Sequence, residues 1–182
     1  MTKSKSAYST PIKQSKLETH IIVVWVDNES GVLARVVGLF SGRGYNIESL
    51  AVAEVDAKNN ISRITIVTTG SPQVVDQIKL QLKKLVPVHK VADFKREDKN
   101  VIFKEMALFK VVGSNSKKEK ALKACKKYNA VILDKTSKSY VIQITALRRE
   151  IDIAAKSLKK YGLVSISRTG AVAMTRGSEV FK

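Results

Sequence analysis

Apolar residues along this chain recur with two different spacings, and the alternation of these spacings predicts its secondary structure. Residues 20–26 form a continuous run of β-branched and aromatic side chains, which predicts a buried strand. Apolar residues then recur at helical spacing over residues 32–41, and Gly42 and Gly44 follow directly as a helix stop. The folded part of the chain is therefore expected to begin with a strand and an amphipathic helix.

The same alternation continues to residue 94 and ends at a charged break over residues 97–100. The expected elements are strands at 45–55, 61–69 and 86–94, a hairpin turn at 57–60, and a helix that starts at Ser71 and Pro72. Together with the first strand and helix they give the order βαββαβ. This order is the ferredoxin-like plan.

The order recurs after the break, although the residues themselves do not repeat. The expected elements are strands at 102–112, 130–133, 140–145 and 163–166, helices at 116–128 and 147–161, and an additional candidate strand at 171–174. We therefore predict an α+β protein of two ferredoxin-like βαββαβ domains. The predicted parts are a flexible basic tail at 1–19, a first domain at 20–96 and a second domain at 97–182.

Positive charge is concentrated in the second half of the chain. The net charge is +17, and residues 97–182 hold nineteen basic and eight acidic side chains. The densest stretch, residues 117–127, fits a solvated helix face or a face that contacts phosphates or an acidic protein. Lys outnumbers Arg by 25 to 8 and aromatic residues are only 6%, so we favour the solvated face.

Nucleic-acid binding remains an alternative because RNA-recognition motifs share the βαββαβ order. Such motifs expose aromatic residues on a central strand, where they stack on bases. Residues 61–69 contain no aromatic residue, and residues 140–145 contain only Tyr140. We therefore expect no nucleic acid among the partners.

Residues that could carry catalysis are sparse. The only histidines, His20 and His89, lie on separate expected strands with no Cys or carboxylate at metal-ligand spacing. Cys125 falls on the inward stripe of its helix, where it fits as a small core residue. No nucleophile elbow, Walker loop or zinc-protease motif occurs. We expect no catalytic residue, metal or cofactor in this chain, and no enzyme activity of its own.

The sequence carries no sign of a membrane or an oxidising compartment. No apolar run approaches the ~18 residues that cross a bilayer, and one cysteine cannot form an internal disulfide. Residues 1–19 lack the apolar core of a secretory signal. We expect a cytoplasmic protein that does not contact a membrane.

One segment suggests a binding site for a small molecule. Residues 27–31 join the first strand to the first helix, so they place a helix N-terminus at the edge of a sheet. Free N–H groups there suit a small carboxylate, and Gly31 removes a side chain from the point of closest approach. Asn28 can hydrogen-bond a ligand. The alternative is that Asn28 or Ser30 simply caps the helix.

The sequence DNESGVLARVVGLFSGRGYNIESL, residues 27–50, resembles the ACT domain of the small, regulatory subunits of acetolactate synthase (acetohydroxyacid synthase). SRITIVTTG at 62–70 and QIKLQLKKLVPVHKV at 77–91 resemble the same family. KVVG at 110–113 and SRTGAVAMTRG at 167–177 do so in the second half. The resemblance covers nearly everything after residue 18.

The resemblance implies a regulatory function. Small subunits of this family bind and activate a large catalytic subunit and confer feedback inhibition by valine, and in some cases by leucine or isoleucine. The complex makes acetolactate for branched-chain amino-acid synthesis. Thiamine diphosphate, magnesium and FAD would belong to the large subunit. ACT domains of the family pair as homodimers, with effector sites between the two chains.

The family's effector residues can be carried over one by one. Asn28, Glu29, Ser30 and Gly31 match the strand-to-helix loop that holds the amino acid. The strand residues supplied across the dimer interface correspond to Asn46 and Ile47, and an apolar pocket for the effector side chain would be lined by Ile47 and Val32.

Two departures from the family pattern stand out. Position 30 is often Pro in the family, and Ser fits the first turn of a helix equally well. The residues at 117–130 and 145–162 differ more, which concerns the surface offered to the large subunit. A stand-alone ACT-domain amino-acid sensor is the alternative function. The match at 167–177 speaks against it, because that segment belongs to the second domain of the small subunits and not to ACT domains in general.

Overall fold

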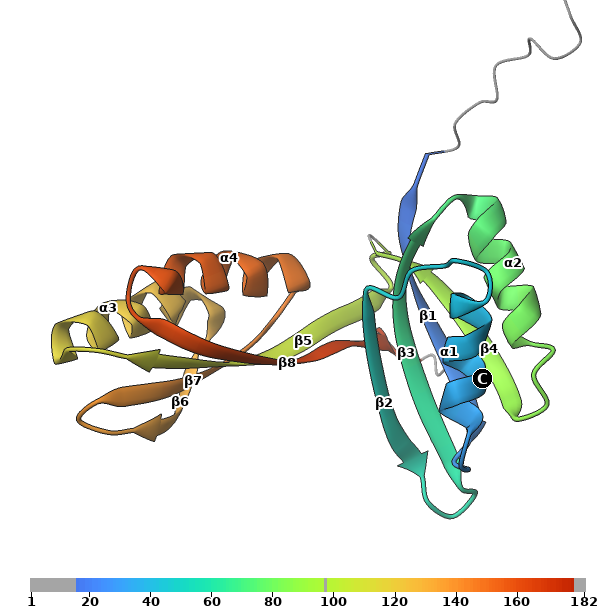
Figure 1. Cartoon of the computed structure of the whole chain (residues 1–182), viewed down its shortest axis with the longest axis horizontal. Helices are drawn as coiled ribbons and strands as arrows, with labels where there is room; N and C mark the ends of the chain where they lie inside the picture. Colours follow the sequence, from blue (N-terminus) through green and yellow to red (C-terminus); the bar gives the residue numbers. More distant parts are fainter. Residues whose placement is uncertain (1–15, 97, 179–182) are drawn as a thin grey trace, which may run out of the picture.

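A computed structural model describes residues 16–96 and 98–178 of the chain. They form two four-stranded antiparallel sheets, each with two helices on one face, so the predicted α+β fold of two βαββαβ units is confirmed (Figure 1). The tail predicted for residues 1–19 lies outside the described residues up to residue 15. Its last two residues instead begin the first strand, because Glu18 and Thr19 pair with Gly70 and Thr69.

The first unit has a sheet of strand order β2-β3-β1-β4. Its elements are β1 (Glu18–Asp27), α1 (Val32–Ser41), β2 (Ser49–Asp56), β3 (Ile61–Gly70), α2 (Pro72–Leu82) and β4 (Val88–Lys95). Central strand β1 is buried on both faces. Ile22 and Val24 pack under the helices, whereas Ile21 and Val23 face the other side of the sheet.

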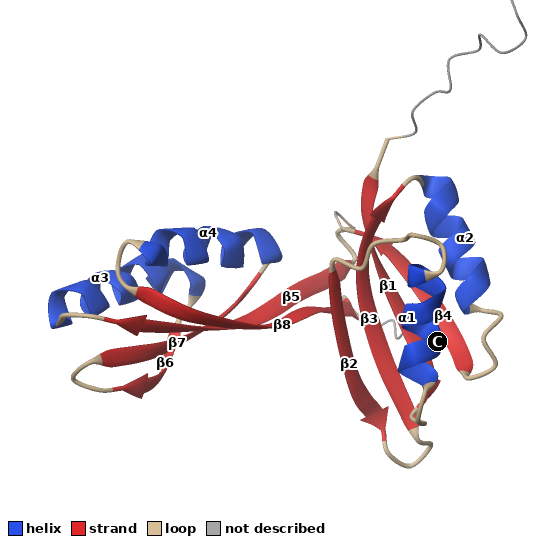
Figure 2. Cartoon of the chain, viewed as in Figure 1, coloured by secondary structure: helices blue, strands red, loops and turns tan. Residues whose placement is uncertain are grey.

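The second unit repeats this plan with the strand order β6-β7-β5-β8. Its elements are β5 (Val101–Val112), α3 (Asn115–Cys125), a short 3-10 helix (Lys126–Tyr128), β6 (Val131–Lys135), β7 (Ser139–Ala146), α4 (Arg148–Lys159) and β8 (Leu163–Thr175). Figure 2 shows both helix pairs against their sheets. No helix of the described part is long and apolar enough to cross a membrane.

Two strand predictions were wrong at their ends. The candidate strands at 163–166 and 171–174 form one strand, β8, because a register shift opposite Glu105 and Ala107 lets it stay paired with β5. The strand expected at 45–55 starts only at Ser49. Asn46 and Ile47 therefore lie in a loop, because the pairing of this segment with β3 begins only at Ser49, opposite Val67.

The lysine-rich stretch is not uniformly solvated, which corrects the prediction for residues 117–127. Lys118 is fully buried, and its Nζ donates to the carbonyl oxygens of Thr136, at 2.9 Å, and Ser137. The same ammonium lies 4.9 Å from the centre of the Tyr140 ring. Cys125 is buried as expected, and burial raises the pKa of its thiol to about 11.

The second unit reaches back to the first through the long strands β5 and β8. The start of β5 and the end of β8 pack against the sheet face that α1 and α2 leave uncovered (Figure 1). Val101 and Ala173 are buried there beside Val23. Arg63 on β3 donates from Nη2 to the Ala173 carbonyl oxygen at 2.5 Å. Within one chain, α1 and α2 thus cover one face of the first sheet, and the start of β5 and the end of β8 pack on the other face.

Candidate functional site

The loop between β1 and α1 is tied to the adjacent β2–β3 hairpin. Asn28 donates its backbone N–H to the Asn60 carbonyl oxygen at 2.7 Å. The side-chain oxygen of Asn28 accepts a hydrogen bond from Ser62 Oγ at 3.0 Å. With that oxygen engaged, the amide N–H groups of Asn28 remain available as donors, and the residue is exposed.

Gly31 begins α1 in a left-handed conformation, with φ of 84°. No side chain hydrogen-bonds the start of this helix, so capping by Asn28 or Ser30 does not occur. The position that a Cβ of Gly31 would occupy has no atom within 4 Å. The helix N-terminus therefore opens onto free space, and its partial positive charge suits a carboxylate.

The predicted site residues differ in burial. Glu29, Ser30 and Gly31 are exposed, and Val32 is buried in the core beneath α1. Asn46 is exposed, and its carbonyl oxygen accepts from Thr68 Oγ1 of β3 at 2.7 Å. Ile47 is half-buried and packs against the same core as Val32. The loop at 45–48 is thereby held by β3.

The chain does not bring these two groups of residues together. Residues 28–31 precede α1, and Asn46 and Ile47 follow it. A helix of ten residues separates them, which spans about 15 Å at 1.5 Å per residue. Figure 1 shows the two loops at opposite ends of α1. One copy of the chain therefore does not bring the two predicted groups of site residues into one pocket.

The edge strand β2 and the start of α1 carry exposed apolar side chains. Val52 and Val55 are 44% and 52% exposed, and Leu33 at the start of α1 is 40% exposed. The outer edge of β2 has no strand beside it in the described part of the chain. An edge of this kind is a ready template for pairing with another chain.

Known proteins match both halves of the chain. Residues 22–90 match the model of the AHAS small subunit-like ACT domain, and residues 104–177 match the model of the small subunit of acetolactate synthase. The acetolactate synthase small subunit of Aquifex aeolicus is 37% identical over 166 residues, which cover 91% of this chain and 85% of that protein.

The chain belongs to the family of acetolactate synthase small subunits.

Other relatives agree with this membership. The acetolactate synthase small subunit of Haemophilus influenzae is 39% identical, covering 87% of this chain and 96% of that protein. The crystal structure of the acetolactate synthase small subunit from Thermotoga maritima superposes with a TM-score of 0.80 at 32% identity. It covers 88% of this chain and 99% of that one.

Family membership makes this chain a regulatory subunit of acetolactate synthase, an enzyme of branched-chain amino-acid biosynthesis. A small subunit implies a large, catalytic subunit as its partner. Within residues 16–96 and 98–178, no three His, Cys, Asp or Glu side chains are grouped so that they could hold a metal ion.

The resemblance assigned residues 28–31 and residues 46–47 to different chains of a dimer, and the ten residues of α1 separate the two groups within one chain. Sequence reasoning missed that Lys118 is buried. A signal for this burial was available, because Lys118 stands three and seven positions before Ala121 and Cys125, on the inward stripe of α3.

Proposed function

We propose that this acetolactate synthase small subunit binds a branched-chain amino acid between two copies of its ACT domain, and that it activates the catalytic subunit and transmits feedback inhibition to it. Valine is the expected effector, with leucine and isoleucine as alternatives. The observation that carries the proposal is the uncapped start of α1 at Gly31, which opens onto free space beside the donor Asn28.

The separation of the two predicted groups of site residues supports a site shared between two copies. The β2–β3 turn lies beside the effector loop, because Asn28 and Asn60 exchange two hydrogen bonds, at 2.7 Å and 3.3 Å. Suppose that two β2 strands pair antiparallel about their middles. The start of one β2, with Asn46 and Ile47, then approaches the turn and the effector loop of the other copy.

Each group in this shared site has a role that its chemistry suits. The effector carboxylate would lie at the N-terminus of α1, where Gly31 leaves room. Asn28 would donate to it, and Asn46 of the partner subunit would accept from the α-ammonium through its side-chain oxygen. Ile47 and Val32 would contact the apolar side chain. A pocket of this kind gains only ~1–3 kcal/mol per methylene, so valine, leucine and isoleucine overlap as effectors.

The test is a thermal-shift titration of the full chain with valine, leucine and isoleucine, with lysine and aspartate as controls. A ligand at a hundred times its dissociation constant adds about 2.7 kcal/mol to the stability of the folded state, which raises the melting temperature by several degrees. We expect a saturable shift with the branched-chain amino acids alone. Inhibition of acetolactate formation by the mixed subunits should follow the same order.

The variants Gly31→Asp and Gly31→Asn separate charge from size at this position. Both side chains tolerate left-handed backbone, and they have nearly the same volume. A carboxylate at position 31 would repel the effector carboxylate, which costs several kcal/mol. We expect Gly31→Asp to weaken the effector by about a hundredfold or more and Gly31→Asn to weaken it less. Equal affinity in wild type and a folded Gly31→Asp variant would refute this site.

A further inference from the structure

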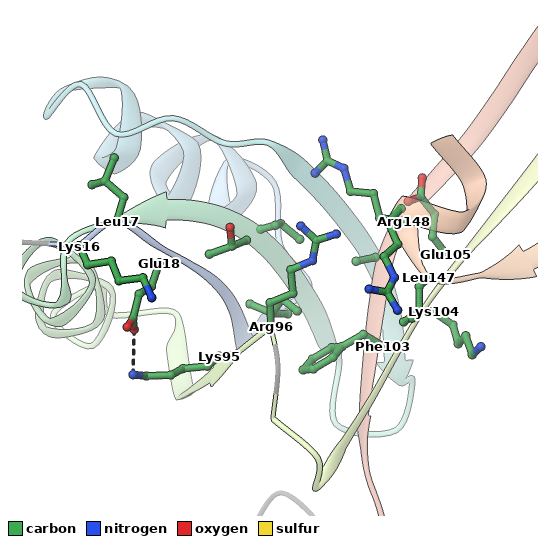
Figure 3. A pocket seen from close by; sticks show the side chains of 15 residues that line it. Lys16, Leu17, Glu18, Lys95, Arg96, Phe103, Lys104, Glu105, Leu147 and Arg148 are labelled. Carbon is green, nitrogen blue, oxygen red and sulfur yellow. Dashed lines mark ion pairs between the residues drawn. The ribbon is translucent and has the colours of Figure 1, made fainter. Parts of the chain in front are cut away.

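A second binding site is suggested by a hollow of about 720 Å³ where the two domains meet (Figure 3). Its walls come from the start of β1, the end of β4, the start of β5 and the start of α4. None of the residues that form the β1–α1 effector loop lines it. Its volume lies within the range of small-molecule sites in proteins, about 300–1,000 Å³.

The lining is strongly basic. Six basic and two acidic side chains face the hollow: Lys16, Lys95, Arg96, Lys104, Arg148 and Arg149 against Glu18 and Glu105. Both carboxylates are already engaged. Lys95 Nζ lies 2.8 Å from Glu18 and holds the pKa of that carboxyl below its usual value. Arg168 donates twice to Glu105, at 2.5 Å and 2.9 Å.

Four of the cations have no carboxylate partner within residues 16–96 and 98–178. They are Lys16, Arg96, Lys104 and Arg149. Arg148 contacts Glu48 at 3.2 Å, across the domain junction. Figure 3 shows Arg96 in the middle of the lining residues and Arg148 to its right. Like charges around a concave surface raise the local potential, and a bound anion relieves their repulsion.

The hollow also has an apolar wall. Ile21 and Val67 are buried at its base, and Phe103, Leu147 and Ala171 line it further out. A bare inorganic ion would leave this wall exposed to water. A ligand with an apolar body and a doubly charged group would use both parts of the lining, because guanidinium groups bind phosphate in a bidentate manner.

We infer that this hollow binds a small phosphate monoester whose organic part is apolar or aromatic. Its phosphate contacts Arg96 from the first domain and Arg149 from the second, and its organic part packs on Phe103 and Leu147. The ligand therefore touches both domains. The site is separate from the amino-acid site and does not depend on it.

The test uses phenyl phosphate as the probe, with inorganic phosphate and phenol as the two halves of its chemistry. Binding to the full chain is measured by isothermal titration calorimetry at low ionic strength. We expect phenyl phosphate to bind with one site per chain and more tightly than either half, and its affinity to fall as salt is added. Absence of binding at several millimolar, or phenyl phosphate no tighter than inorganic phosphate, would overturn the inference.

Two matched variants locate the binding. Arg96→Gln and Lys120→Gln each remove one positive charge, but Lys120 lies on the exposed face of α3 away from the hollow. Loss of one charge-assisted hydrogen bond predicts about tenfold weaker binding in Arg96→Gln and no change in Lys120→Gln. Equal losses in both would show a non-specific charge effect and refute the site.

Two further variants address misfolding of Arg96→Gln and binding of the anion in the effector site. Arg149→Gln provides a second test of the lining if Arg96→Gln does not fold, and it should weaken phenyl phosphate by a similar factor. Gly31→Asp should bind phenyl phosphate like wild type, because Gly31 is not part of the lining. Loss of phenyl phosphate binding in a folded Gly31→Asp variant would mean that the anion binds in the effector site, which contradicts a separate site.

Discussion

Lys118 shows how a single polar side chain can organise one of the two cores. Its ammonium is fully buried and hydrogen-bonds two consecutive carbonyl groups, those of Thr136 and Ser137. These carbonyls lie in the turn between β6 and β7, so the side chain joins α3 to that hairpin. A buried charge requires such partners, because an unpaired one would be strongly destabilising.

Lys118→Met should therefore lower the free energy of unfolding by about 1.5–3 kcal/mol, since it removes the hydrogen bonds from a charged group that join α3 to the carbonyl oxygens of Thr136 and Ser137. Urea denaturation followed by circular dichroism measures the change. Lys120→Met is the control, because Lys120 is exposed on the same helix and should stay within about 0.5 kcal/mol. Similar losses in the two variants would contradict the structural role of Lys118.

The buried thiol of Cys125 predicts a change in stability at alkaline pH. Burial raises its pKa from 9.0 to about 11, so the unfolded chain loses this proton at a lower pH than the folded chain. Ionisation therefore favours unfolding, and the contribution of Cys125 to stability declines as pH rises from 9 to 11. We expect Cys125→Ala to lose stability less steeply than wild type over this range in urea denaturation. Parallel pH profiles would contradict it.

At the scale of elements, the sequence pattern predicted the start of each α-helix to within about one residue and the ends of α1, α3 and α4 to within about three residues. The α1 pattern matched its observed bounds, because Val32, Val36 and Phe40 keep one strict face toward the core. Strand ends were harder to predict, since they depend on partners distant in sequence. Nothing local indicated that β8 would run unbroken through Gly170, or that residues 45–48 would stay outside β2.

The candidate effector site was likewise only partly predictable from the sequence. The loop at 28–31 was predictable, because it follows a buried strand and precedes an amphipathic helix. The resemblance placed Asn46 and Ile47 across a dimer interface, but their position in a loop outside β2 was not predictable, because the start of β2 depends on its pairing with β3. The interdomain hollow left no local signal either, since its basic residues come from segments far apart in sequence, such as Arg96 and Arg149.

At Gly170 the strand β8 lies against the start of β2. Gly170 has φ of 80°, and a Cβ there would lie 2.6 Å from Ser49 Oγ and 3.3 Å from the Leu50 carbonyl oxygen. Gly170→Ala should lower the free energy of unfolding by about 2–3 kcal/mol, through backbone strain and this overlap. Gly44→Ala shares the left-handed backbone but meets no atom within 4 Å, so it should cost only about 1 kcal/mol. Equal losses in urea denaturation would show that the contact with β2 is unimportant.

At the scale of the whole molecule, the question is whether two copies pair through β2. Hydrogen-bond direction identifies which groups of β2 are available. Along a central antiparallel strand, successive residues direct their backbone N–H and C=O groups to the two neighbouring strands in turn. The backbone N–H of Asn28 donates to the carbonyl oxygen of Asn60, which lies directly opposite it. Even-numbered residues of β3 therefore hydrogen-bond β1, and odd-numbered residues hydrogen-bond β2. Val52 is paired with Ile64, an even-numbered residue. The backbone N–H of Val52 therefore points away from the sheet, toward the free edge.

Val52→Pro removes that outward N–H and leaves the ladder between β2 and β3 intact, as proline is tolerated on edge strands. If β2 pairs with its copy, Val52→Pro should sediment as a monomer at micromolar concentration, where wild type is a dimer, and should lose the thermal shift caused by valine. Val52→Thr keeps the N–H and the branched shape, so it should remain a dimer and respond to valine. A folded Val52→Pro variant that still dimerises would place the interface elsewhere. A monomeric variant that still binds valine would mean that one chain holds the effector alone. That result would contradict a shared site, because α1 separates residues 28–31 from Asn46 and Ile47 by roughly 15 Å within one chain.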